Sequence, residues 1–159
     1  MRGKRAPKRK IEPDPKYNSL EVAKFINHIM LRGKKAVAQK IVYDCFAILA
    51  AKNKQKPLET FEKAVRNVAP VVEVKGRRVG GANYQVPIPV TGDRKNTLAF
   101  KWLIEAARNK KGKAMSEKLA DEILAAINNE GDAIKKKQDV QRMAEANRAF
   151  AHFANFVKR

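Results

Sequence analysis

Hydrophobic side chains recur at helical spacing over most of the chain. The first stripe follows Ser19, a residue type that caps helix N-termini, and comprises Val22, Phe25, Ile26, Ile29 and Met30. Their i, i+3, i+4, i+7, i+8 spacing predicts a helix that ends at Gly33. Similar stripes predict five further helices, at about 35–51, from 57 to near 70, from 93 to 109, from 116 to 131, and from about 133 towards the C-terminus.

Two of these helices have informative faces. In the fourth helix, expected to have its N-cap at Asp93, the side chains of Arg94, Lys101 and Arg108 fall within roughly 40° of one another. Apolar residues, including Trp102, fill most of the remaining circumference, so the helix should be mainly buried behind a narrow cationic stripe. In the second helix we expect the buried face to comprise Val37, Ile41, Cys45, Ile48 and Leu49.

Residues 71–90 break the helical pattern. Two apolar-alternating runs flank Gly80-Gly81, which predicts two antiparallel strands joined by a tight turn. Pro87 and Pro89 lie two positions apart, so their missing N–H groups should face the outer edge of the hairpin. We expect the Tyr84 ring either to pack across the hairpin on Val79 or Val74, or to stack on a nucleic-acid base. Because a lone hairpin contributes little core, this one is expected to enter a groove of a partner.

These elements predict a mainly α fold. We expect a bundle of six helices with a protruding two-stranded β-hairpin, residues 71–90, between the third and fourth helices. Residues 1–18 contain Pro7, Pro13 and Pro15 among many cations, and should form a basic, flexible tail. Residues 19–159 should form one domain, because no linker long enough to separate two domains interrupts them.

Charge narrows the class of partner. The 159 residues contain 35 Lys and Arg against 16 Asp and Glu, a net charge of +19. Six of the cations lie in the first ten residues, so most of the excess belongs to the body. A folded body with this charge repels itself and is suited to a polyanion that neutralises it. We therefore expect a nucleic-acid-binding protein, most consistent with RNA.

Candidate catalytic chemistry is sparse. His28 and His152 lie on different predicted helices without a cysteine or carboxylate at metal-ligand spacing, which argues against a zinc site. Cys45 belongs to an apolar stripe, and Gly33-Lys34 lacks the rest of a phosphate-binding loop. We predict no enzyme activity, no metal and no cofactor. One cysteine and no long apolar run predict a cytoplasmic protein that does not cross a membrane.

Several longer motifs resemble a known family. They are DPKY (14–17), VAKFIN (22–27), GKKAVAQKIVYD (33–44), RRVGGANYQVP (77–87), LAFKWLIEAAR (98–108) and MAEANRAFAHF (143–153). Together they resemble bacterial small-subunit ribosomal protein seven, whose fold is six helices with a β-hairpin between the third and fourth. The resemblance implies direct, early binding to the 3′ major domain of small-subunit ribosomal RNA, which nucleates assembly of the subunit head. It also implies a position at the subunit interface, near the decoding centre and the tRNA exit site, lining the mRNA exit path. The implied protein neighbours are small-subunit proteins nine and eleven.

The same resemblance assigns residues by position. Those implied to bind ribosomal RNA are Arg2, Lys4, Arg5, Lys8, Arg9, Lys10, Lys34, Lys35, Lys75, Arg77, Arg78, Arg94, Lys95, Lys101, Arg108, Lys110, Lys111 and Lys113. The hairpin tip would approach exit-site tRNA and mRNA through Gly80, Gly81, Ala82, Asn83 and Tyr84. The C-terminal HFANFVKR departs from the aromatic and basic ending HYRW of bacterial relatives, and Pro89 stands where an acidic residue is frequent.

Two alternatives remain from the residues themselves. A DNA-bending architectural protein would insert such a β-arm into a minor groove, although an apolar wedge is expected at the tip of such an arm, and here the tip is Gly-Gly-Ala. An RNA-processing enzyme would need an acid, base or metal cluster that the sequence lacks.

Overall fold

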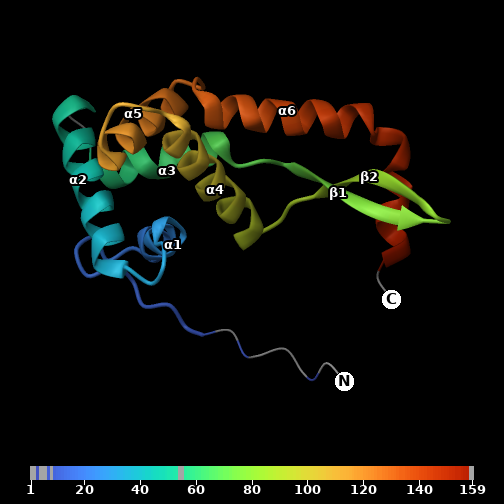
Figure 1. The fold of residues 1–159 in the computed structure, drawn as a ribbon, viewed down its shortest axis with the longest axis horizontal. Helices are drawn as coiled ribbons and strands as arrows, with labels where there is room; N and C mark the ends of the chain where they lie inside the picture. Colours follow the sequence, from blue (N-terminus) through green and yellow to red (C-terminus); the bar gives the residue numbers. More distant parts are fainter. Residues whose placement is uncertain (1–2, 4–6, 8, 54–55, 158–159) are drawn as a thin grey trace.

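The structure is a computed structural model that describes residues 3, 7, 9–53 and 56–157, with side chains described as far as residue 154. Its elements, in chain order, are α1 (Leu20–Ile29), α2 (Lys35–Asn53), α3 (Pro57–Val68), β1 (Val72–Val79), β2 (Ala82–Pro89), α4 (Asp93–Asn109), α5 (Met115–Ile127), α6 (Asp132–Ala146) and the 3-10 helix η1 (Arg148–Val157). The predicted fold class is confirmed: the chain is mostly helical, with an antiparallel hairpin between α3 and α4. The hairpin and α6 extend together from one side of the helical body (Figure 1).

The core of the body is formed where the first four helices meet. Each contributes one fully buried phenylalanine, namely Phe25 from α1, Phe46 from α2, Phe61 from α3 and Phe100 from α4. The Phe25 ring lies 4.8 Å from Phe61 and 5.3 Å from Phe100, and Phe46 lies 5.5 Å from Phe61, measured between ring centroids. Such tilted aromatic pairs add to the stability gained from burying their apolar area. Trp102 is also in the core, as predicted.

The buried face of α2 differs from the predicted one. Val37 is 55 % exposed, and the fully or nearly fully buried residues are Ala38, Val42, Cys45, Phe46 and Leu49. The face is set by Phe46, because burying an aromatic ring yields more free energy than burying a valine. Cys45 is buried as expected, and burial raises the pKa of its thiol to about 12. It is therefore an inert core residue.

Helix ends agree with the sequence only in part. The Ser19 cap is confirmed, since the Val22 N–H donates to its Oγ at 3.5 Å. However, α1 ends at Ile29, and Gly33 lies in the following turn at φ +74° instead of terminating the helix. Gly92 and Ala114, one residue before Asp93 and two before Ser116, occupy the N-cap positions of α4 and α5. Asp93 instead pairs across to Lys24 of α1, at 2.8 Å.

The hairpin has the predicted geometry. Gly80 and Gly81 form the turn at φ +57° and +91°, values that side-chain-bearing residues rarely adopt. Val90 donates its N–H to the Val71 carbonyl at 2.9 Å. Because strands have a period of two, the N–H groups of Val86 and Ile88 also face β1. The nitrogens of Pro87 and Pro89 therefore face outward, and the expected outer-edge placement is confirmed.

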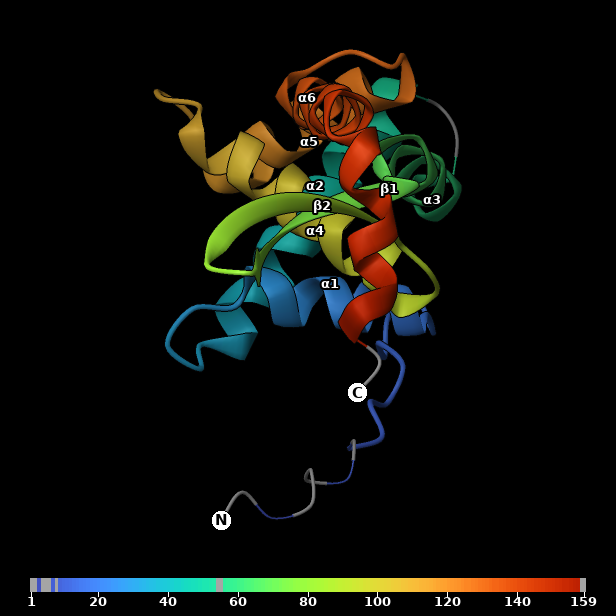
Figure 2. The ribbon, with the colours of Figure 1, turned by 90° about the vertical axis from the view of Figure 1, so that its right-hand side faces the viewer.

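The predicted sixth helix is two segments. α6 ends at Ala146, where the Asn147 side chain donates to the Met143 carbonyl at 2.8 Å. The chain then bends sharply, and η1 crosses the hairpin at a steep angle to α6 (Figures 1 and 2). Tyr84 of β2 lies 5.1 Å from both Phe150 and Phe153 of η1. These two rings of η1 are packing partners that were not predicted from the sequence. The hairpin is consequently braced by the C-terminal segment.

Candidate nucleic-acid interface

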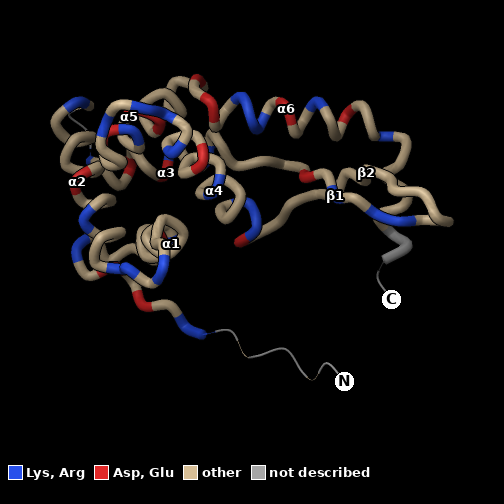
Figure 3. The backbone as a smooth tube through the Cα atoms, in the orientation of Figure 1, with Lys and Arg blue, Asp and Glu red and all other residues tan. Residues whose placement is uncertain are grey.

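Lysines and arginines are spread over the body and the hairpin (Figure 3). The first cluster lies in the turn between α1 and α2, where Arg32 and Gly33 both adopt positive φ, at +52° and +74°. The tight turn exposes the cationic side chains of Arg32 and Lys34 on either side of the glycine, and that of Lys35, the first residue of α2, is exposed next to them. Sequence reasoning missed Arg32, although it immediately precedes the Gly-Lys-Lys run. Exposed donors next to a glycine can approach a phosphate closely.

The hairpin divides its cations between two faces. Arg77 is opposite Tyr84 in the register and Arg78 is opposite Asn83. Arg78 is exposed, whereas Arg77 is half-buried, and its Nε is covered with no hydrogen-bond partner among the described residues. Lys75 lies on the Arg77 face and pairs with Glu73 at 2.6 Å. The residues of the tip before Tyr84, from Gly80 to Asn83, are all exposed.

A mostly buried carboxylate organises the base of the hairpin. Glu73 is 8 % exposed and accepts hydrogen bonds from the Nε and a terminal nitrogen of Arg94, at 3.1 and 2.9 Å, in addition to its pairing with Lys75. Burial alone would raise the pKa of Glu73, but the hydrogen bonds and the positive charges of Lys75 and Arg94 together outweigh it and lower the pKa. Glu73 thus joins β1 to the first turn of α4 and fixes the direction of two predicted RNA-binding cations.

The fourth helix has the predicted stripe. Arg94, Lys101 and Arg108 are all exposed, while Leu98, Phe100, Trp102 and Leu103 are buried. Each cation also has a contact within the protein. Lys101 lies 3.7 Å from Glu105, and Arg108 donates to the Ile29 carbonyl at 3.2 Å. The Lys101–Glu105 pair is exposed on both sides and is weak enough for a stronger anion to replace it.

The loop after α4 mixes two kinds of lysine. Lys110 pairs with Glu122, whose side chain has no exposed surface. Lys113 pairs with Asp121 at 3.0 Å, and Asp121 also pairs with Lys52 of α2 at 2.9 Å. Hydrogen bonds from Lys52 and then Lys113 lower the pKa of Asp121. Lys111 is exposed and has no carboxylate within ion-pair distance among the described side chains. The structure therefore separates Lys111 from two neighbours that are engaged in holding helices together.

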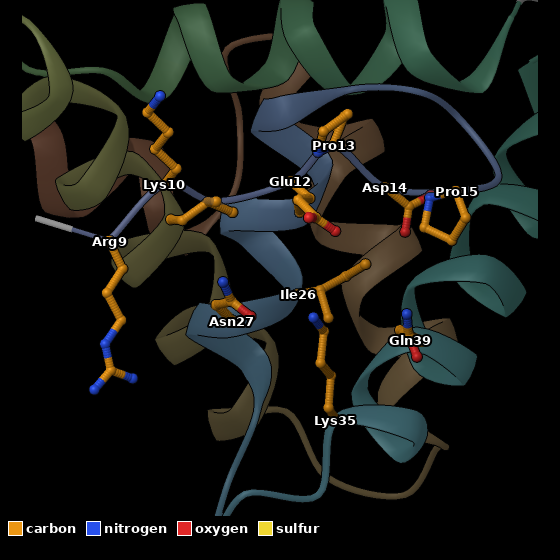
Figure 4. Close-up of a pocket in the computed structure, with 12 residues that line it drawn as sticks. Arg9, Lys10, Glu12, Pro13, Asp14, Pro15, Ile26, Asn27, Lys35 and Gln39 are labelled. Carbon is orange, nitrogen blue, oxygen red and sulfur yellow. The ribbon is translucent and has the colours of Figure 1, made fainter.

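The described part of the tail lies over α1 and α2. Arg9 and Lys10 line a cavity of about 630 Å³ together with Asn27 of α1 and Lys35 of α2 (Figure 4). The structure thus brings two predicted tail residues and one predicted turn residue to the same site. Arg2, Lys4, Arg5 and Lys8 fall outside the described residues.

Other chemistry finds little support in the described part of the chain. His28 is on the exposed side of α1, and partial desolvation lowers the pKa of its imidazole. No group of three or more histidines, cysteines, aspartates or glutamates is arranged to hold a metal among the residues with described positions. Within the same residues, no helix combines the length and the apolar character needed to cross a membrane.

Comparison with known proteins identifies the family. The family model described as "Ribosomal protein S7p/S5e" matches residues 1–148, so the match ends where η1 begins. Three proteins named "Small ribosomal subunit protein uS7" are similar over nearly their whole length. The one from Thermotoga maritima is 61 % identical over 153 residues, 96 % of this chain and 99 % of that protein. The one from Clostridium novyi is 57 % identical, covering 92 % and 94 %, and the one from Marinobacter nauticus is 56 % identical, covering 93 % and 95 %. The resemblance seen in the sequence motifs is confirmed, and the chain belongs to the ribosomal protein S7p/S5e family of small-subunit ribosomal proteins.

Proposed function

We propose that this protein, a structural constituent of the small ribosomal subunit, binds the 3′ major domain of the subunit's ribosomal RNA directly. In this role it nucleates assembly of the subunit head in the cytoplasmic ribosome. Binding of this kind depends on shape and phosphate contacts, because A-form RNA hides its major groove while irregular junctions expose phosphates and splayed bases. The family is not an enzyme family, which agrees with a structural role.

The observation that carries this proposal is the set of exposed cations that the protein does not neutralise itself. Lys34, Lys35, Arg78 and Lys111 are exposed and have no carboxylate within ion-pair distance among the described side chains. Lys34 and Lys111 lie in connecting segments, Arg78 lies in β1 of the hairpin and Lys35 is the first residue of α2, so all four lie where the backbone as well as the side chain can approach phosphate. Lys101, by contrast, is paired within the protein, with Glu105 at 3.7 Å.

We further propose that the hairpin and η1 lie at the subunit interface, near the decoding centre and the tRNA exit site, along the mRNA exit path. The exposed residues Gly80 to Asn83 would come nearest to exit-site tRNA and mRNA, because glycine lets the main chain approach another nucleic acid closely. Tyr84 supports the tip by packing on Phe150 and Phe153, which leaves less of its ring for stacking on a base. Small-subunit proteins nine and eleven are the proposed protein neighbours.

Competition binding tests the choice of nucleic acid. A ribosomal RNA junction fragment of the head domain should displace the protein from duplex DNA at equal nucleotide concentration and fixed salt. Equal affinity for both would instead favour the DNA-bending alternative, in which the arm enters a minor groove.

A pair of variants that remove the same charge tests the proposed RNA-binding surface at Lys34 and Lys35. Replacing Lys34 and Lys35 by alanine should weaken binding of the RNA fragment more than replacing Lys56 and Lys135. The second pair removes the same charge from exposed lysines paired with Glu59 and Asp132, at 3.6 and 3.5 Å, elsewhere on the protein. Equal losses would mean that only net charge matters, and the proposed surface would be wrong.

A further inference from the structure

Asp14 is a nearly buried carboxylate in the segment between the tail and α1. It is 2 % exposed, although it is flanked by Pro13 and Pro15, which are both exposed. Its Oδ2 accepts the N–H groups of Lys16 and Tyr17, both at 3.1 Å, and its Oδ1 accepts the hydroxyl of Tyr43 on α2 at 2.7 Å. All three bonds go to the charged form of the carboxylate, and bonds of that type are stronger than neutral ones.

Two contacts between aromatic rings and one cation–π contact reinforce this attachment. The Tyr17 ring lies 5.0 Å from Phe46 and 6.0 Å from Tyr43, and the Lys16 ammonium lies 4.9 Å from the centre of the Tyr43 ring. Burial, followed by the hydrogen bond to Asp14, raises the pKa of Tyr43 to about 12, so its hydroxyl remains a donor at neutral pH. We call residues 14–17 together with Tyr43 the clasp. It fastens the chain to α2 before α1 begins.

The clasp determines where the tail leaves the body. From Asp14 the chain runs back over α1, and residues 9–13 form one wall of the cavity that Lys35 and Asn27 line from the other side (Figure 4). Two backbone hydrogen bonds close the same turn, from the Asp14 N–H to the Ser19 carbonyl at 3.2 Å and from the Asn18 N–H to the Asp14 carbonyl at 2.8 Å. If the clasp and this turn opened, the first fixed point would be Ser19, the N-cap of α1, and five extra residues would give the tail roughly 17 Å of additional reach at 3.3–3.6 Å per residue. Arg9 and Lys10 would then no longer be held at the cavity that Lys35 lines.

We infer that Asp14 is a positioning residue for RNA binding: its carboxylate fastens the tail to Tyr43 and so holds Arg9 and Lys10 at the cavity that Lys35 also lines, where one stretch of RNA backbone can contact all three. The inference rests on the proposed function. Cations held in place before binding lose less conformational entropy when the RNA arrives, so they contribute more to affinity than the same cations on a free tail.

The clasp and simple electrostatics predict opposite effects of Asp14→Ala on RNA affinity. Asp14→Ala removes a negative charge, so a model based on net charge predicts stronger RNA binding. The clasp predicts weaker binding, by about three- to tenfold, because the tail loses its preorganisation. Glu12→Ala is the matched control. Glu12 is exposed in the same segment, and its replacement removes the same charge while leaving the clasp intact. Its affinity should equal or exceed that of the wild type.

A double-mutant cycle that combines Asp14→Ala with deletion of residues 1–10 shows whether Asp14 acts through the tail. The same head-domain RNA fragment is titrated with the full chain and with a chain lacking residues 1–10, each with and without Asp14→Ala. The loss caused by Asp14→Ala should largely disappear in the truncated pair. Tyr43→Phe, which keeps the ring but removes the hydroxyl, should reproduce the loss in the full chain more weakly. Melting temperatures are measured for every variant, and binding is compared well below all of them.

Two outcomes overturn the inference. One is an equal loss from Asp14→Ala in the full and truncated chains, which would show that Asp14 acts on the body alone. The other is an Asp14→Ala variant that binds RNA as well as Glu12→Ala does. Failure of the proposed function would give a different result. The wild-type protein would then show no preference for the ribosomal RNA fragment over duplex DNA, independently of the result of the double-mutant cycle.

Discussion

Lys110 and Glu122 form an ion pair in which the Lys110 Nζ lies 2.5 Å from a carboxylate oxygen of a side chain with no exposed surface. The other oxygen of Glu122 accepts the N–H of Ala133 at 2.9 Å. Glu122 therefore links the loop after α4 to the first turn of α6. A Cβ added to Gly131 would lie 2.8 Å from this second oxygen, so the glycine leaves room for the link. A lysine implied to bind RNA thus has a structural contact of its own.

Replacing Lys110 should therefore destabilise the free protein. Lys110→Met is expected to lower the free energy of unfolding by about 2–4 kcal/mol, because it leaves a buried carboxylate without its cation. Lys111→Met is the control, since Lys111 is exposed and unpaired among the described side chains, and its effect on stability should be small. Urea denaturation of both variants measures the difference. Equal stabilities would show that the Lys110–Glu122 pair contributes little.

Glu73 should make the junction of the hairpin with α4 sensitive to acid. Its pKa is lowered from an ordinary value of 4.5, because the hydrogen bonds and the positive charges of Lys75 and Arg94 together outweigh the effect of burial. A group with a lowered pKa contributes stability that is fully present above its ordinary pKa and is lost as pH falls through the folded-state value. Wild type should melt at a higher temperature than Glu73→Gln at pH 6, and this gap should narrow at pH 3. A gap that stays constant or widens in acid would contradict the assignment.

The secondary structure was largely predictable, because periodicity, proline and glycine carry strong local signals. The hairpin, its turn at Gly80-Gly81 and the outward placement of Pro87 and Pro89 all follow from such signals. The buried face of α2 does not, because apolar residues surround much of that helix. Stripes beginning at Val37 and at Ala38 both fit the spacing, and only the packing of Phe46 against Phe61 decides between them.

The candidate interface was predictable as a set of cations but not as a set of contacts. Nothing local to Lys110 or Lys75 reveals which carboxylates they meet. Glu122 lies among the buried residues Leu119 and Ile123, and Glu73 lies in a strand, so both are exceptions to the usual exposure of glutamate. The contacts of Asp14 could not be predicted from the sequence for a different reason. A segment rich in proline and charge predicts a tail, whereas packing against Tyr43 depends on the position of α2.

Removing residues 1–10 should weaken RNA binding while leaving the melting temperature of the free protein nearly unchanged. The deleted segment ends before Asp14, so the clasp and the core stay intact. Differential scanning calorimetry and RNA titration on the same preparation measure the two effects. A large fall in melting temperature would show that residues 1–10 contribute substantially to the stability of the folded body.

The hairpin tip should affect exit-site events more than binding of ribosomal RNA. Gly80→Val and Gly81→Val place side chains at φ +57° and +91° and should distort the turn without unfolding the helices, because the tip is exposed. Gly76→Val is a control within β1, where φ is not positive and an added Cβ would meet only the end of Gln85, at 3.9 Å.

The tip variants are compared with wild type in two assays, binding of a head-domain RNA fragment and retention of exit-site tRNA on assembled subunits. Trimming the tip should reduce tRNA retention while largely preserving fragment binding. The reverse result would show that the tip belongs to the ribosomal RNA contact, as Arg77 and Arg78 are proposed to do.

The dependence of RNA affinity on salt tests the account most directly, because it counts the phosphates that the protein neutralises. If about eight phosphates are contacted, the logarithm of the binding constant for a head-domain RNA fragment should fall with the logarithm of salt concentration with a slope of roughly −6 to −7. The Lys34→Ala/Lys35→Ala variant should have a shallower slope than Lys56→Ala/Lys135→Ala. A wild-type slope shallower than about −2 would show that the exposed cations take little part in binding, and the proposed interface would be wrong.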